Sequence, residues 1–132
     1  MDNLVNNNVL WSELLVTALE TYGIKYACIS PGSRNTPLVI AFQNAKKIKT
    51  FVHVDERSSG FFAIGLVHQT KSPVVLVTTS GTAVTELYPA VVEAYYKRIP
   101  LIILTADRPQ AMHNIGANQT ISQPYTVAFQ TE

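Results

Sequence analysis

Seven residues in four short polar segments of this sequence could take part in chemistry. They comprise one carboxylate, two guanidinium groups, one amide and the small or hydroxylated residues beside them: Ser33, Arg34, Glu56, Gly81, Thr82, Arg108 and Gln119. Arginine presents a fixed fork of N–H donors that matches a carboxylate or a phosphate. A partly buried glutamate can exchange a proton near neutral pH. These residue types favour acid–base chemistry on an anionic ligand.

The first segment, "SPGSRNTPL", is predicted to be a strand-to-helix turn. Thr36 can cap a helix whose first position is Pro37. The backbone amides of that helix start, with Ser33 and Arg34 beside them, suit a carboxylate or a phosphate. The alternative is a plain turn in which Arg34 pairs with a nearby acid.

Glu56 lies in the segment "HVDERSSGFF" beside another acid, Asp55. Position alone offers a simple explanation for both, because the helix dipole favours acids in a first helical turn. A chemical role for Glu56 is favoured by its place between an apolar strand and a helix of small residues, where it would be partly buried. His53 is expected to be a core or hydrogen-bonded residue.

The third and fourth segments also allow two readings. "TSGTA" lacks the Gly-Lys-Ser/Thr ending of a Walker loop and the spacing of a nucleophile elbow. Gly81 and Thr82 are therefore interpreted as a turn of close approach with a helix cap. In the last segment, Asp107 and Arg108 could simply pair with each other. Otherwise Arg108 and Gln119 belong to a long polar loop that faces a ligand.

Apolar runs rich in β-branched residues alternate with helical stretches along the chain. The runs cover residues 25–30, 50–54, 73–79 and 100–106, and the helical stretches cover residues 10–22, 36–45, 55–70 and 82–97. Continuously apolar runs are typical of parallel strands covered on both faces. The alternation predicts an α/β fold: three layers, with helices on both faces of a mostly parallel sheet. The polar segments then lie at the carboxyl ends of the strands, where such folds bind ligands.

Local signals refine two of the helices. Asparagines at positions 6–8 can cap the first helix, and Gly23 can end it. Trp11 and Tyr22 fall on its apolar face and are expected in the core. Pro89 predicts a kink or a late start within the helix at residues 82–97.

Composition narrows the function classes. The 132 residues suffice for one domain, residues 1–132, with a real core. A net charge of +1 gives no basic field, so nucleic acid is not an expected partner. The single cysteine, Cys28, provides no disulfide or thiolate metal site and is expected to be buried. With no signal peptide and no membrane-length apolar run, the expected location is the cytoplasm.

Read together, five segments resemble one family. They are "SPGSRNTPL", "HVDERSSGFFAIGL", "VVLVTTSGTAVTELYPAVVEA", "IPLIILTADRP" and "IGANQTISQ". The resemblance is to the amino-terminal pyrimidine-binding domain of thiamine-diphosphate-dependent enzymes. A glutamate after the second strand and "TSGTA" occur broadly in these enzymes. The other segments are similar to the branch that makes 2-succinyl-5-enolpyruvyl-6-hydroxy-3-cyclohexene-1-carboxylate in menaquinone biosynthesis.

This resemblance implies a reaction and residue roles. In that branch, 2-oxoglutarate is decarboxylated on thiamine diphosphate and the succinyl unit is added to isochorismate. Glu56 stands where the family places the glutamate that hydrogen-bonds the aminopyrimidine ring of the cofactor. Ser33 and Arg34 match residues that hold a substrate carboxylate. Arg108 and Gln119 match positions near the bound intermediate.

The resemblance also implies what this chain lacks. Gly81 and Thr82, in the turn shared across the family, are expected to approach the cofactor. The diphosphate and Mg²⁺ are expected on a separate domain marked by Gly-Asp-Gly and a later Asn-Asn; this sequence has no Gly-Asp-Gly, and its only consecutive asparagines are at positions 6–8. That domain would come from a second subunit of a homodimer or homotetramer. The chain is thus expected to be the amino-terminal part of a longer enzyme and inactive alone.

Two alternatives remain at this stage. An acetohydroxyacid-synthase-like enzyme or a related decarboxylase would share Glu56, but it would have no reason to direct Ser33 and Arg34 at an isochorismate carboxylate. A non-catalytic α/β interaction module would need none of these residues for chemistry.

Overall fold

The computed structural model describes residues 6–124, 126 and 127 and contains the predicted alternation of helices and strands. In chain order the elements are α1 (Asn7–Thr21), β1 (Tyr26–Ile29), α2 (Thr36–Asn44), β2 (Lys49–Val52), α3 (Glu56–Thr70), β3 (Val74–Thr78), α4 (Thr82–Glu86), α5 (Tyr88–Tyr96), β4 (Leu101–Thr105) and the 3-10 helix η1 (Gln110–Met112). Each predicted strand and helix is confirmed, with ends that shift by a few residues.

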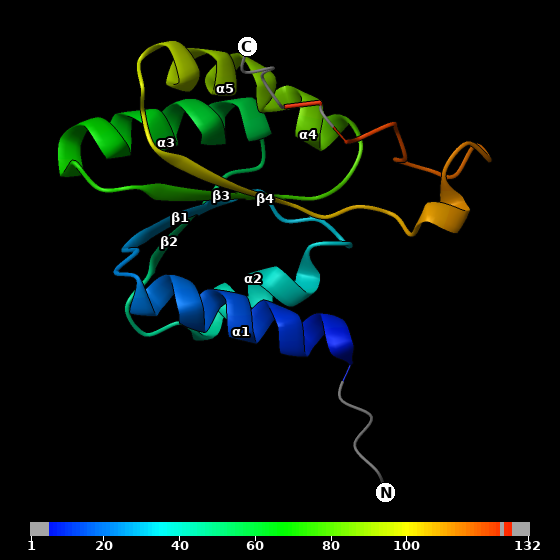
Figure 1. Ribbon diagram of the computed structural model, residues 1–132, viewed down its shortest axis with the longest axis horizontal. Helices are drawn as coiled ribbons and strands as arrows, with labels where there is room; N and C mark the ends of the chain where they lie inside the picture. Colours follow the sequence, from blue (N-terminus) through cyan, green and yellow to red (C-terminus); the bar gives the residue numbers. More distant parts are fainter. Residues whose placement is uncertain (1–5, 125, 128–132) are drawn as a thin grey trace, which may run out of the picture.

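The four strands form one sheet in the order β2-β1-β3-β4, and every neighbouring pair is parallel. Helices α1 and α2 cover one face, while α3, α4 and α5 cover the other (Figure 1). The predicted α/β fold with helices on both faces is therefore confirmed. Because β1 and β3 are central, their residues are the most deeply buried, whereas β2 and β4 form the two edges.

Alternate residues of the central strands serve two different cores. Ala27 and Val75 pack in the cluster beneath α1 and α2. Cys28 and Leu76 pack in the cluster beneath α3 and α5. Side chains of a strand point alternately to opposite faces, so a sheet covered on both sides needs continuous apolar runs. Cys28 is fully buried, as expected, and burial raises the pKa of its thiol to about 12.

Helix α1 is capped as predicted but buries a different face. Asn6 accepts a hydrogen bond from the Asn8 N–H at 3.0 Å, and Gly23 follows the helix with φ +81°. The prediction that Trp11 and Tyr22 lie in the core is wrong, since they are 68% and 86% exposed. The buried stripe of α1 is Ser12, Val16 and Leu19. Ser12 tolerates burial because its hydroxyl donates to the Asn8 carbonyl at 2.7 Å.

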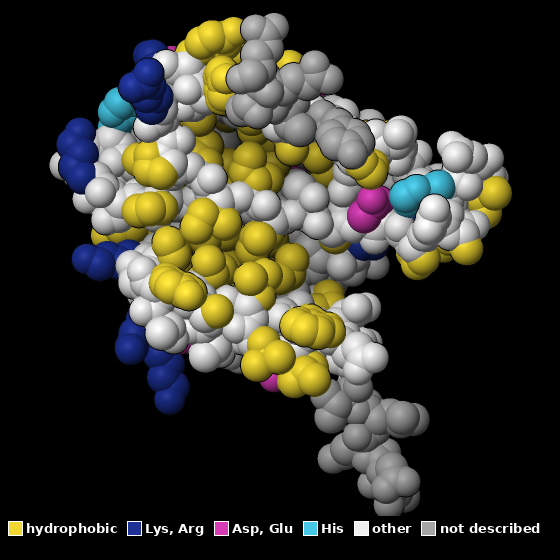
Figure 2. All heavy atoms as spheres, viewed as in Figure 1, with side chains coloured by type: hydrophobic (Ala, Val, Ile, Leu, Met, Phe, Trp, Pro, Cys, Tyr) yellow, Lys and Arg dark blue, Asp and Glu magenta, His cyan; other side chains and the backbone are white. Residues whose placement is uncertain are grey.

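The apolar flank of α1 is left open because the sheet ends at β4. Leu10, Trp11, Leu14 and Leu15 are all at least 39% exposed, and every residue of β4 is only half-buried. Figure 2 shows hydrophobic side chains gathered on this face. The helix periodicity therefore identified an apolar face correctly but did not show how much of that face the sheet covers.

Pro89 divides the third predicted helix as expected. Helix α4 ends at Glu86, α5 begins at Tyr88, and Pro89 lies in the first turn of α5. Proline is favoured there because its missing N–H would have no partner in a first turn. Helix α5 then packs closely against α3, where a Cβ added to Gly60 would lie 2.6 Å from Cβ of Ala90.

This contact makes Gly60→Ala a test of the packing between α3 and α5. Because the added methyl group would overlap the Ala90 side chain, we expect a loss of about 1–3 kcal/mol in the free energy of unfolding. Gly65→Ala in the same helix is the matched control, since a Cβ there meets nothing within 4 Å. That variant should gain up to about 1 kcal/mol from helix propensity. Urea unfolding measures both, and equal effects would contradict the observed packing.

Candidate functional site

The loops that follow the four strands all lie at the carboxyl edge of the sheet. Because the strands are parallel, the chain leaves each of them at this edge. Ser33 and Arg34 follow β1, Glu56 follows β2, and Gly81 follows β3. The loop after β4 runs through η1 and returns over the same edge. The predicted grouping of the polar segments is thus confirmed at the level of the fold.

A buried asparagine shapes the turn that carries Ser33 and Arg34. Asn35 is fully buried; its Oδ1 accepts from the Gly32 N–H at 2.7 Å and its Nδ2 donates to the Ser30 carbonyl at 2.9 Å. One amide therefore fastens both sides of the turn. The prediction that Thr36 caps α2 is wrong, since Thr36 is the first residue of the helix and its hydroxyl donates to the Ser33 carbonyl at 2.8 Å.

Gly32 lets this turn approach the end of β3. A Cβ added to Gly32 would lie 2.7 Å from Cβ of Thr79, which is closer than side-chain carbons approach. Thr79 is itself buried. The absence of a side chain at position 32 is therefore a condition for the placement of the neighbouring Arg34.

Gly81 makes the second close approach. It has φ +75°, and a Cβ there would lie 2.8 Å from both Cγ and the carbonyl oxygen of Gln119. The Ser80 hydroxyl donates to the same carbonyl at 2.9 Å. The interpretation of Gly81 as a turn of close approach is confirmed, and the group that approaches is the chain's own loop. Thr82 begins α4, is exposed and makes no side-chain cap.

Two arginines from distant loops meet at one carbonyl oxygen. Arg34 Nη2 donates to the Asn118 carbonyl at 3.2 Å, and Arg108 Nη2 donates to the same oxygen at 3.0 Å. Arg34 Nη1 also donates to Gln119 Oε1 at 3.1 Å. Within the described residues, neither guanidinium forms a salt bridge with a carboxylate. Two positive charges therefore lie close together against neutral acceptors.

The alternative that Asp107 pairs with the Arg108 side chain is not observed. Asp107 Oδ1 accepts from the Arg108 backbone N–H at 2.7 Å and lies 3.7 Å from His113 Nε2. The Arg108 guanidinium turns the other way, toward the Asn118 carbonyl and the sulfur of Met112. Its charge is therefore not neutralised by Asp107.

Glu56 is half-buried at the first position of α3, as its sequence context predicted. Asp55 performs the capping role, because its Oδ1 accepts from the Ser58 N–H at 2.6 Å. Hydrogen bonds from the Ser58 backbone and side chain hold the pKa of Asp55 below its usual value. The Glu56 carboxylate makes no hydrogen bond or ion pair within the part of the chain that the structure describes.

The structure gathers part of the predicted set and separates the rest. Arg34, Arg108 and Gln119 meet at the β4 side of the carboxyl edge, and Gly81 lies under Gln119. Ser33 is exposed on the turn before Arg34. Glu56 follows β2, which lies on the opposite side of β1 from β3 and β4. We call Arg34, Arg108 and Gln119 the arginine group. The Glu56 carboxylate lies apart from it on the same edge.

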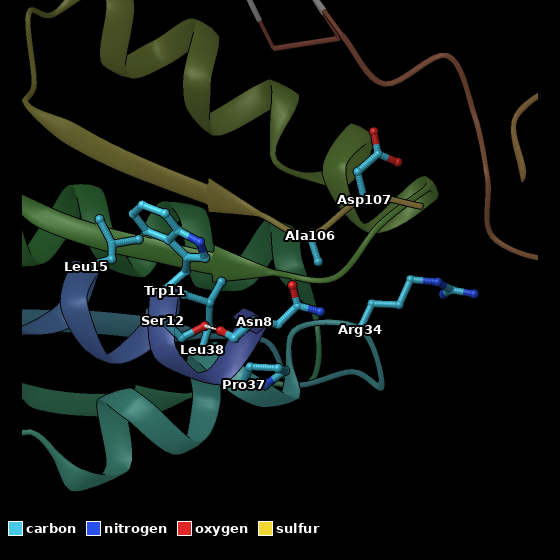
Figure 3. A pocket seen from close by; sticks show the side chains of 9 residues that line it. All are labelled: Asn8, Trp11, Ser12, Leu15, Arg34, Pro37, Leu38, Ala106 and Asp107. Carbon is cyan, nitrogen blue, oxygen red and sulfur yellow. Dashed lines mark hydrogen bonds between the residues drawn. The ribbon is translucent and has the colours of Figure 1, made fainter. Parts of the chain in front are cut away.

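A cavity of about 300 Å³ adjoins the arginine group. It is lined by residues of α1, the start of α2 and the end of β4: Asn8, Trp11, Ser12, Leu15, Arg34, Pro37, Leu38, Ala106 and Asp107. Figure 3 shows the Arg34 side chain extending away from Trp11 and Leu15. The guanidinium thus lies outside the apolar part of this cavity and belongs with the loop after β4.

Sequence reasoning missed two residues that organise the site, Asn35 and Gln123. Gln123 is 8% exposed, and its Oε1 accepts from the Gly81 N–H at 3.1 Å. A single polar residue in a turn gives no sign of whether its amide is buried. The one available signal was the glycine that each amide binds, because Gly32 and Gly81 both mark a close approach of another segment.

The structure adds two further observations about metals and membranes. In the described residues, no three His, Cys, Asp or Glu side chains gather closely enough to hold a metal ion. No helix in the described part of the chain has both the length and the hydropathy that a membrane crossing requires.

Known proteins resemble this chain over most of its length. Proteins named 2-succinyl-5-enolpyruvyl-6-hydroxy-3-cyclohexene-1-carboxylate synthase from Haloquadratum walsbyi, Roseiflexus castenholzii and Shewanella sp. (strain W3-18-1) are 50%, 49% and 46% identical to it. The alignments cover 89%, 89% and 93% of this chain but 19%, 20% and 22% of the relatives. The chain therefore spans about a fifth of the length of these relatives.

The chain also matches a protein family as a whole. The family described as "Thiamine pyrophosphate enzyme, N-terminal TPP binding domain" matches residues 11–126. This range begins in α1 and includes every strand of the sheet and all four loops of its carboxyl edge. The chain therefore belongs to the thiamine pyrophosphate enzymes, as their N-terminal cofactor-binding domain.

Proposed function

We propose that this domain serves a synthase that decarboxylates 2-oxoglutarate and adds the succinyl unit to isochorismate in menaquinone biosynthesis. The names of the relatives support the reaction class. The observation that carries the assignment of substrate residues is the convergence of Arg34 and Arg108 on one carbonyl. Both substrates are carboxylates, and such a pair of guanidinium groups suits a carboxylate.

The arginine pair favours an anion for an electrostatic reason. A carbonyl oxygen accepts hydrogen bonds but does not neutralise two guanidinium charges. A substrate carboxylate would offer two charged oxygens to the same donors, and hydrogen bonds between charged groups are about twice as strong as neutral ones. In this proposal Arg34 and Arg108 bind and orient the carboxylate of isochorismate, and Ser33 and Gln119 contribute neighbouring polar groups.

Two observations support the cofactor role that we propose for Glu56. Because Asp55 caps the helix, the Glu56 carboxylate is not used for that purpose. Half-buried at the start of α3, it can share a proton with a ring nitrogen of the aminopyrimidine. When bound, thiamine diphosphate supplies the electron sink for decarboxylation of a 2-oxo acid. Gly81 and Thr82 are proposed to line the cofactor side of the same edge.

The remaining parts of the site are proposed to come from outside this chain. A diphosphate-binding domain of a second subunit would hold the diphosphate and Mg²⁺, in a cytoplasmic homodimer or homotetramer. The exposed side chains beside Glu56 support such a cover, since Val52 and Val54 are 67% and 93% exposed. Contiguous exposed apolar patches mark interfaces, and we propose that these two valines belong to such a patch.

The arginine assignment is tested by Arg34→Ala in the full-length protein. Losing a charge-assisted hydrogen bond costs about 1.5–3 kcal/mol, so we expect the KM for isochorismate to rise about 10-fold to 100-fold. The KM for 2-oxoglutarate should change little. Steady-state kinetics with each substrate varied in turn measures both constants.

Two further variants sharpen this test. Arg34→Lys keeps the charge but loses the planar fork of donors, so its KM should fall between those of the wild type and Arg34→Ala. Lys46→Ala removes an exposed cation that precedes β2 at the opposite edge of the sheet and should leave both constants unchanged. An equal rise of both KM values in Arg34→Ala would indicate a structural role.

The Glu56 assignment is tested by Glu56→Gln, which keeps the shape and removes the exchangeable carboxyl proton. We expect proton exchange at C2 of bound thiamine diphosphate to slow by about 10²-fold to 10⁴-fold, the usual worth of a positioned acid–base group. Proton NMR after mixing with D₂O measures the exchange rate. Asp55→Asn is the matched control, because asparagine is an equally good helix cap. Unchanged exchange in Glu56→Gln would refute the role.

A further inference from the structure

Gln123 connects three segments at the carboxyl edge of the sheet. Its Oε1 accepts from the Gly81 N–H at 3.1 Å, at the end of the turn after β3. Its Nε2 donates to the Ala106 carbonyl at 2.8 Å and to the Thr105 hydroxyl at 3.3 Å, at the end of β4. The side chain is 8% exposed, so these bonds are shielded from water. One amide thus ties the loop after β4 to two strand ends.

The residues that Gln123 holds in place are those that meet the arginines. Four positions before it, the Gln119 carbonyl fills the space above Gly81 and accepts from the Ser80 hydroxyl. Gln119 Oε1 and the neighbouring Asn118 carbonyl are the acceptors for Arg34. The same Asn118 carbonyl is the acceptor for Arg108. The bonds of Gln123 therefore lie outside the arginine group but fix the loop on which it depends.

We propose that Gln123 is a positioning residue whose buried amide fastens residues 118–123 to the ends of β3 and β4. It thereby holds Arg34 and Arg108 in the arrangement that receives the substrate carboxylate. The inference rests on the proposed function for its substrate, and on the hydrogen bonds of Gln123 for its geometry. Without this amide, the Gly81 N–H and the Ala106 carbonyl lose a buried partner, and the loop is no longer fixed.

The test compares Gln123→Met with the wild type in the full-length protein. Methionine keeps most of the volume and removes all three hydrogen bonds. We expect faster amide hydrogen exchange in the peptides that cover residues 107–123, measured by mass spectrometry without substrate. We also expect the KM for isochorismate to rise about 10-fold, a loss that a misplaced binding group can cause, with an unchanged KM for 2-oxoglutarate. A purely structural role would not distinguish the two substrates.

A second variant and a control keep the test decisive if Gln123→Met fails to fold. Gln123→Glu keeps the acceptor for the Gly81 N–H but places a carboxylate oxygen against the Ala106 carbonyl, so both effects should have the same sign as in Gln123→Met. Gln69→Met changes an exposed glutamine of α3 and should alter neither measurement.

Two results would overturn the inference: unchanged exchange over residues 107–123 in both Gln123 variants, or an equal rise of the two KM values. Failure of the wild-type protein to convert isochorismate would refute the proposed function instead. The exchange comparison would then decide alone whether Gln123 fastens the loop.

Discussion

All four strands run in one direction, and the arrangement of the site depends on this constraint. Parallel neighbours cannot be joined by a tight turn, so the chain crosses back through helices after each of the first three strands. Each crossover begins at the same edge, which brings together loops that lie far apart in the sequence. Arg34 and Asn118 come into contact there, although 84 positions separate them. The common direction of the strands thus places the polar loops at one edge of the sheet, and the residues of those loops determine which chemical groups meet there.

Buried side-chain amides supply hydrogen-bond partners for the backbone groups that the loops bury at this edge. Loops that cover strand ends bury backbone N–H and C=O groups, which are costly without partners. An amide carries both a donor and an acceptor, so Asn35 and Gln123 can each satisfy two segments at once. A hydroxyl carries its donor and its acceptors on one atom, so it reaches two separate segments less easily. Three buried hydroxyls of the same edge, those of Ser30, Thr78 and Thr79, have no partner among the described residues.

More of the fold than of the site could be predicted from the sequence. The strands could be located because burial on both faces forces continuous apolar runs, and the break before Pro89 follows from a property of a single residue. Trp11 and Tyr22 were misplaced because periodicity identifies an apolar face without showing what covers it. The fastening role of Gln123 depends on contacts with strand ends more than 15 positions away, and no local pattern encodes such contacts.

The backbone of Gln119 links strain in the loop to the position of the arginines. Its φ of +55° is in the left-handed region, which costs a residue other than glycine about 1–2 kcal/mol. That conformation persists because the same residue is held at both ends: its carbonyl accepts from Ser80, and its side chain accepts from Arg34. Strain compensated by surrounding contacts is typical of functional loops. This conformation lets one residue direct its carbonyl at the β3 turn and its side-chain amide at Arg34, so the strained backbone connects the fold to the position of that arginine.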